Sequence, residues 1–377
     1  MLAVEKNTRR DNIFTIVVCL IMVVLFFVPT GFENIQGKNS VRARARVLAV
    51  DNSDVGQYGI VRTGDQGLIL KILNGKFKGL QTESNNLLIG KLELDKMFSV
   101  GDIALVTIDM DENDNFVYAN PIDHYRLNIE IILLVLFSVL LVIFAGTTGL
   151  KALLSFLFTG FAIWKILIPG FLKGWNPILL SLLIVAAMSA VIIFLVGGLS
   201  KKGIISFIGT IAGIAFTAVF SLLFGKLFHV HGAVKPFSET LLYSGYAHLD
   251  LTEIFISGIF LASSGAVMDI SMDISASMHE IKQKRPDIHA KELIISGIKV
   301  GRAVVGTMTT TLLLAYSGSY TAVLMVMMAQ GTPAANIFNL TYVSAEILHT
   351  LVGSFGLVLT APLTAIIGGI VYSRHVE

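Results

Sequence analysis

Two aspartates, Asp269 and Asp273, lie four residues apart at the end of the apolar run 251–270. Residues with this spacing share one face of an α-helix, and Ser277 extends that face by another turn. Two carboxylates so placed can hold a cation, or share a proton whose affinity is raised by burial and by the neighbouring like charge. The alternative is that the helix has reached water here and both carboxylates are solvated. The pair is a candidate polar site, and both explanations stay open.

A basic residue and a group of hydroxyls follow in the apolar run 295–316. Arg302 lies inside that run, where a partner such as Asp269 would offset its desolvation. Snorkelling to the membrane surface is the alternative. Gly306 would allow another helix to approach closely, and hydroxyls would line a pathway, although threonine also bonds back to its own helix. The hydroxyls that we assign to the candidate site are those of Thr307, Thr309 and Thr310.

A third polar cluster precedes the last apolar run, where Glu346 and His349 are three residues apart. This spacing is also used for metal ligation on helices, but no second pair of the same kind occurs. The histidines of the loop 226–250 are more simply explained as exposed side chains. We therefore assign Glu346 to the polar site and predict no metal, no cofactor and no catalytic residue.

The composition indicates which elements must position these residues. Of 377 residues, 54% are hydrophobic and 14% are charged, whereas about a quarter are charged in a soluble domain. The excess of apolar residues has to face lipid. A net charge of +2 gives no reason to expect a nucleic-acid partner. The only cysteine, Cys19, excludes an intrachain disulfide and a zinc site of the CxxC type.

Apolar runs long enough to cross a membrane recur along the chain. The first, 13–28, follows Lys6, Arg9 and Arg10 and lacks a small-x-small cleavage site, so we predict an uncleaved anchor with a cytoplasmic N-terminus. The short run 319–333, which ends at Gly331-Thr332-Pro333, is a candidate for a broken or re-entrant helix. The prediction is therefore eight or nine transmembrane helices. The other runs are 127–145, 151–169, 177–198, 204–225, 251–270, 295–316 and 351–372.

Residues 35–125 differ in kind, because most of the polar and turn-rich sequence is gathered there. Val41 to Val47 alternates with period two, and Asn74-Gly75 is a hairpin signal. About six short strands predict a small barrel of the OB or SH3 type, and the arginines among them are best explained as a solvated strand face. The predicted fold is thus a polytopic α-helical membrane protein with a small extracytoplasmic β domain after the first span. Its parts are an N-terminus and anchor at 1–34, the β domain at 35–125 and a helical domain at 126–377.

Basic residues set the predicted orientation, because cytoplasmic loops are enriched in them. Loops with Lys151, with Lys201-Lys202 and with the basic residues of 282–291 then lie inside, while 35–125 and 226–250 lie outside. Nine spans would leave Arg374 and His375 outside, where a basic tail is disfavoured.

Three motifs together resemble the YibE/F-like family of bacterial membrane proteins. They are Gly265 to Met278, the stretch Gly301-Arg302-x-x-x-Gly306-Thr307-Met308-Thr309, and Glu346-x-x-His349 followed by Gly353-Ser354-x-Gly356-Leu357. The resemblance covers most of the chain and implies a multi-pass protein of the bacterial cell membrane with a transport role. The plan of an anchor, an outer domain and a polar helical pair is also similar to the SecF-like half of the RND superfamily.

Two functions follow as hypotheses. The first is a gradient-driven transporter or exporter of an unknown solute or ion, since the chain has no phosphate-binding loop. The second is a non-transporting scaffold or protein-translocation accessory factor whose outer domain holds a partner. An enzyme is disfavoured, because HExxH and GxSxG are absent and both aspartates lie on one helix. The lipid bilayer is the expected surrounding, and a homo-oligomer or a partner membrane protein is left open.

Overall fold

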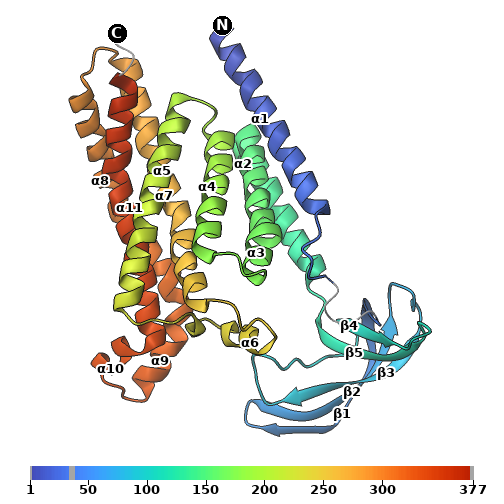
Figure 1. Ribbon diagram of the computed structural model, residues 1–377. Coiled ribbons are helices and arrows are strands. Elements are labelled where there is room, and N and C mark those ends of the chain that lie inside the picture. The colour runs from blue at the N-terminus through green and yellow to red at the C-terminus, as the bar shows by residue number, and fades with distance from the viewer. Residues whose placement is uncertain (1, 34–38, 374–377) are drawn as a thin grey trace. The chain divides into compact units, whose positions relative to one another are not determined.

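The structure is a computed structural model that describes residues 2–33 and 39–373. It divides into two compact units, one of Met1–Thr30 with Leu141–Glu377 and one of Gly31–Leu140. Most of the helices belong to the first unit and the sheet to the second (Figure 1). Each unit has a hydrophobic core of its own.

Long apolar helices make up the first unit, which takes α2 from Leu141 onward, and polar caps mark several of their ends. The side chain of Asn176 accepts the N–H of Leu179 at the start of α4, and Asp250 accepts two N–H groups at the start of α7. The long helices are α1 (Leu2–Phe27), α2 (Leu127–Ala162), α4 (Pro177–Val196), α5 (Lys201–Leu227), α7 (Leu251–Lys284), α8 (Ala290–Ser317) and α11 (Thr341–Ser373). The short elements are a π-turn (Ile163–Leu167), α3 (Ile168–Leu172), the 3-10 turns η2 (Gly232–Val234) and η3 (Gly318–Tyr320), α6 (Ser238–Tyr243), α9 (Thr321–Ala329) and α10 (Ala334–Asn339).

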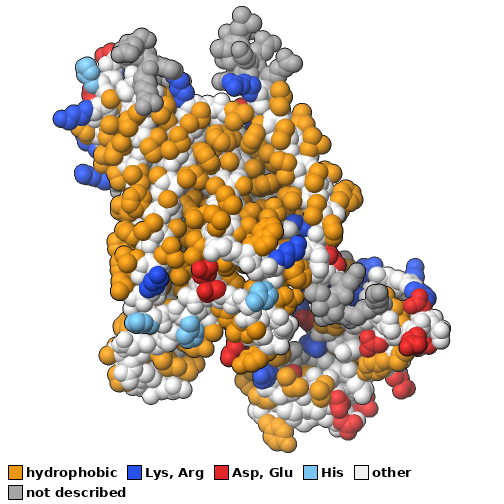
Figure 2. All heavy atoms as spheres, viewed as in Figure 1, with side chains coloured by type: hydrophobic (Ala, Val, Ile, Leu, Met, Phe, Trp, Pro, Cys, Tyr) orange, Lys and Arg blue, Asp and Glu red, His pale blue; other side chains and the backbone are white. Residues whose placement is uncertain are grey.

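Within the described residues, seven helices are long and apolar enough to cross a membrane. One of the seven is the 46-residue stretch Leu127–Leu172, which Gly146 interrupts with φ 56° and ψ −130°. Glycine adopts such a conformation readily because it has no Cβ. The runs expected at 127–145 and 151–169 are therefore two arms on either side of this kink. Figure 2 shows a bundle surface that is mainly hydrophobic, with most charged side chains toward its ends.

The run 319–333 forms no helix of membrane-spanning length. It contains η3 and the nine-residue α9, which at 1.5 Å per residue is about 14 Å long. That is less than half of the roughly 30 Å of hydrocarbon that a span must cross. The proline and glycine at 331–333 end α9, and α10 and α11 follow.

Small residues allow three helices of the bundle to pack closely. A Cβ on Gly213 of α5 would collide with Thr360 of α11, and a Cβ on Gly356 of α11 would collide with Thr217 of α5. Each threonine donates its hydroxyl to a carbonyl of its own helix, so no polar group is left unsatisfied at the contact. α7 packs on both helices and on α4 and α8.

The sheet of the second unit has five antiparallel strands in the order β3-β2-β1-β4-β5. Five strands occur where about six were expected, because β1 is 19 residues long and continues through a bulge between Asp51 and Asp54. The predicted alternation holds in β1, where Ala43, Ala45 and Val47 are buried between the arginines. The strands are β1 (Ser40–Tyr58), β2 (Val61–Ile72), β3 (Gln81–Ile89), β4 (Ile103–Met110) and β5 (Phe116–His124).

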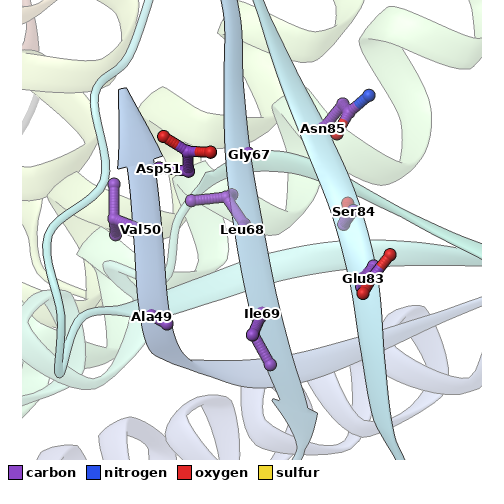
Figure 3. Close-up of a pocket in the computed structure, with 9 residues that line it drawn as sticks. All are labelled: Ala49, Val50, Asp51, Gly67, Leu68, Ile69, Glu83, Ser84 and Asn85. Atoms are coloured by element: carbon purple, nitrogen blue, oxygen red, sulfur yellow. The ribbon is translucent and has the colours of Figure 1, made fainter. Parts of the chain in front are cut away.

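The sheet curls until its two edge strands meet. The Ser84 hydroxyl of β3 donates to the carbonyl of Ala119 on β5 at 2.6 Å, and the N–H of Asn85 donates to the Tyr118 hydroxyl at 2.8 Å. A hollow of about 350 Å³ lies over β1, β2 and β3, with Asp51 and Glu83 among its lining residues (Figure 3).

Candidate functional site

An ion pair with a buried carboxylate joins the start of α11 to the loop between α5 and α7. Lys235, which follows η2, places its Nζ 3.1 Å from Oε2 of Glu346. The carboxylate side chain is 10% exposed and the lysine side chain 37%. A carboxylate so deep in a helical bundle needs a partner, because leaving it uncompensated is strongly destabilising.

His349 lies one turn after Glu346 on the same face of α11, as the spacing predicts. Its Nδ1 is 3.8 Å from Oε1 of Glu346. The ring stacks on Tyr316 from the end of α8, with centroids 4.2 Å apart and planes at 22°. Both ring nitrogens are buried and have no hydrogen-bond partner among the described residues. Buried nitrogens in this state are uncommon in native proteins and call for an explanation.

We name one group of side chains the outer cluster: Lys235, Tyr316, Tyr320, Glu346 and His349. A pocket of about 160 Å³ adjoins this cluster. Lys235 and His349 line the pocket together with apolar side chains. Lys235 Nζ also lies 5.6 Å from the ring centroid of Phe255 and 5.9 Å from that of Tyr320. Aromatic faces at this range stabilise an ammonium group. The other lining residues are Gly232, Ser238, Leu241, Leu251, Ile254, Phe255 and Gly258.

The carboxylate of Glu346 has two possible cationic partners, Lys235 and a protonated His349. Glu346 has Lys235 on one oxygen and the His349 ring near the other. A proton on His349 would make it a second cation beside the same carboxylate, in competition with Lys235.

The two aspartates expected to form a site are exposed on α7, and neither has an ion pair or hydrogen bond within the described chain. Arg302 is likewise exposed on α8, and no ion pair joins it to Asp269. The hydroxyls of Thr307, Thr309 and Thr310 donate to carbonyls of their own helix. The structure therefore brings Glu346 into a cluster and leaves the other candidates apart from it.

No group of three or more His, Cys, Asp or Glu side chains in 2–33 and 39–373 could hold a metal ion. The outer cluster contributes one carboxylate and one imidazole, which is fewer than the ligand sets of protein metal sites.

Comparison with protein-family models identifies the family. The model of the YibE/F-like proteins matches residues 133–374 of this chain. The chain belongs to the YibE/F-like family. Neither a curated protein nor a solved structure matches the chain significantly.

The region shared with the YibE/F-like family contains most of α2, the helices from α3 to α11 and every residue of the outer cluster. The strands of the second unit precede it. The outer cluster and the exposed aspartates of α7 thus belong to the part of the molecule that defines the family.

Sequence reasoning found Glu346 and His349 in this YibE/F-like protein but missed Lys235, Tyr316 and Tyr320. Lys235 stands in a loop with no local pattern that links it to α11. The signal that was present is a balance of charge: a carboxylate inside a bundle requires a cation, and Lys235 is a basic residue of the loop between α5 and α7.

Proposed function

We propose that this YibE/F-like protein is a gradient-driven transporter or exporter in a membrane. The observation that carries the proposal is the ion pair of Lys235 with the buried carboxylate of Glu346, beside an imidazole whose nitrogens have no hydrogen-bond partner among the described residues. Buried ionisable side chains are costly, and in membrane bundles they mark ion and proton pathways.

Proton binding at His349 is the proposed coupling step. The protonated ring attracts Glu346, and Lys235 is then released from the carboxylate. Because Lys235 belongs to the loop that lines the pocket, its release alters the pocket and the loop together. Asp269 is a second proton-binding group in this proposal, since it lies on α7 without an ion-pair or hydrogen-bond partner among the described residues.

We further propose that the chain crosses the membrane eight times, and this number assigns each loop to a side. The spans are α1, the two arms separated by Gly146, α4, α5, α7, α8 and α11, with 319–333 outside the membrane. With a cytoplasmic N-terminus, eight crossings leave the C-terminal basic residues inside, as the positive-inside rule favours. The outer cluster then faces the extracytoplasmic side of a bacterial cell membrane.

The test uses the full chain in liposomes that contain a pH-sensitive dye. Pools of small solutes are added with a pH gradient imposed in either direction, and the internal pH is followed. We expect at least one pool to change the internal pH with the wild-type chain. Glu346→Gln and Asp269→Asn should fold and insert but abolish the response, while the exposed control Glu239→Gln should retain it. The absence of any wild-type response under both gradients would contradict the transport proposal.

The second candidate is a scaffold or protein-translocation accessory factor that uses the outer domain. The observation in its favour is the hollow over β1, β2 and β3, whose lining includes the acidic residues Asp51 and Glu83 (Figure 3). We further propose that the sheet is an OB-like barrel, since order β3-β2-β1-β4-β5 with β3 against β5 is the strand order of that fold. Replacing Asp51 and Glu83 by Asn and Gln separates the two candidates, because it should leave solute-dependent flux unchanged and weaken only partner binding.

A further inference from the structure

Two basic side chains lie within one turn of each other on the exposed surface of α8. Lys299 and Arg302 are both exposed, and neither has an ion pair within the described residues. The only acidic residue of α8 is Glu292, which is bound to Arg285 at 2.8 Å. Figure 2 shows lysine and arginine side chains along the edge of the bundle that α8 occupies in Figure 1. The two cations thus lack an acidic partner in the part of the chain that the structure describes.

The pair points away from the bundle. A Cβ added at Gly297 would collide with side chains of α7 and α11, and so would a Cβ added at Gly301. These two glycines therefore mark the face of α8 that packs inward. At about 100° per residue, Lys299 lies about 180° and Arg302 about 120° from the middle of that face. Both side chains consequently face the surroundings of the bundle and not a neighbouring helix.

The pair also lies near the boundary of the hydrocarbon. A span needs about 20 residues, and counted back from the end of α8 at Ser317 these begin at residue 298. Lys299 is then at the boundary, and Arg302 is about one turn inside it. Side chains of a helix tilt toward its N-terminus. Both long side chains therefore reach back from these positions to the level of the lipid phosphates.

We propose that Lys299 and Arg302 bind the phosphate of an anionic phospholipid, such as phosphatidylglycerol. Two like charges on neighbouring turns of a helix face repel each other, and one phosphodiester between them removes the repulsion. Arginine presents a planar fork of N–H donors to the phosphate, and lysine adds a compact charge. A zwitterionic headgroup would bring its own ammonium to the pair, so a lipid with a net negative charge is favoured. The site is separate from the outer cluster. It requires that α8 crosses a membrane, and it does not depend on a transport function.

Quenching by spin-labelled lipid tests the site. A fluorophore is attached at Ala303→Cys, next to Arg302, in a Cys19→Ala background, and the full chain is placed in phosphatidylcholine nanodiscs. Phosphatidylglycerol or phosphatidylcholine with a nitroxide high on one acyl chain is then added. We expect half-maximal quenching at a mole fraction of phosphatidylglycerol about fivefold or more below that of phosphatidylcholine, from the attraction of an anionic lipid to basic residues. A fluorophore at Ala187→Cys, exposed on α4, should show no such preference. Equal quenching by the two lipids at position 303 would overturn the proposal.

Charge variants show which side chains bind the lipid. Lys299→Gln with Arg302→Gln should abolish the preference for phosphatidylglycerol. The exchange Lys299→Arg with Arg302→Lys keeps both charges and should retain it. Lys291→Gln is the matched control, because it removes one exposed charge from the same helix about 12 Å nearer its N-terminus. A preference that survives the double glutamine variant, or that Lys291→Gln removes equally, would refute the assignment.

A protein on this face would give a different result. Oxidation of the Ala303→Cys variant in native membranes, without the fluorophore, should leave the chain monomeric if lipid covers the face. Disulfide-linked dimers, or adducts with another membrane protein, would show that protein covers the face instead, and the proposal would then be wrong.

Discussion

Lys235 and Glu346 are 111 residues apart in the chain, and their charged atoms meet at 3.1 Å. The pair ties the loop after α5 to the start of α11. Since the carboxylate is nearly buried, the contact determines both where that loop lies and what charge the neighbouring pocket carries.

The first prediction concerns the strength of this pair. Breaking a fully buried pair costs roughly 3–5 kcal/mol. Because the lysine side chain is 37% exposed, solvent screens the contact, and we expect Lys235→Met to cost about 1–3 kcal/mol. Thermal unfolding in detergent measures this loss. Lys173→Met, at an exposed lysine, should change little.

A double-mutant cycle shows whether the two residues act on each other. Adding Glu346→Gln to Lys235→Met removes the uncompensated carboxylate, so the double variant should recover part of the lost stability. Strictly additive losses would mean that the observed contact contributes nothing to the fold.

The second prediction concerns the seam between α5 and α11. Gly356→Ala should destabilise the bundle by about 1–3 kcal/mol, as overpacking of a filled core does, because the added methyl group would collide with Thr217. Gly160→Ala is the matched control, since a Cβ at that position of α2 meets nothing within 4 Å. Its unfolding temperature should be unchanged or slightly higher, as alanine is the better helix former. Equal effects of the two variants would show that the seam is not closely packed.

The third prediction concerns acid stability of the sheet unit. The backbone N–H of Ile89 holds the pKa of Asp95 below its ordinary value, helped by the N–H groups of Gly90 and Lys91. A lowered pKa means that the ionised form stabilises the fold, fully above the unfolded value near 3.9 and progressively less as pH falls through the folded value.

Amide exchange across 88–96 reports this contribution. Protection of the wild-type segment should fall as the pH drops from about 5 to 3, after correction for intrinsic exchange. Asp95→Asn should show weaker protection with no such pH dependence. In the exposed control Glu93→Gln, amide protection should depend on pH as it does in the wild type. A wild-type profile that does not change over this range would exclude the predicted role of Asp95.

The fourth prediction concerns the sides of the membrane. In a Cys19→Ala background, an impermeant thiol reagent should label Glu93→Cys and Glu239→Cys in intact cells. Lys284→Cys should react only after the cells are permeabilised. The reverse pattern would contradict the eight-span arrangement, and labelling of all three would indicate leaky cells and require a cytoplasmic control enzyme to be measured in parallel.

Much of the architecture follows from local pattern. The lengths of the apolar runs indicated most of the long helices, because crossing hydrocarbon demands about 20 residues whatever the partners are. The alternation from Val41 to Val47 indicated a strand, since side chains of a strand point to opposite faces. The run 319–333 was the exception, because its composition is apolar but its proline and glycine end α9 early.

The amino-acid sequence by itself determined that Glu346 and His349 share a face of one helix, because three residues are nearly one helical turn. Only the tertiary structure decided that Lys235 meets Glu346 and that Asp269 and Arg302 do not meet. Local spacing sets the face of a helix on which a side chain lies. The rotation of one helix against another depends on contacts between distant residues, such as Gly213 with Thr360 and Gly301 with Ile274, and these exist only once the bundle has packed.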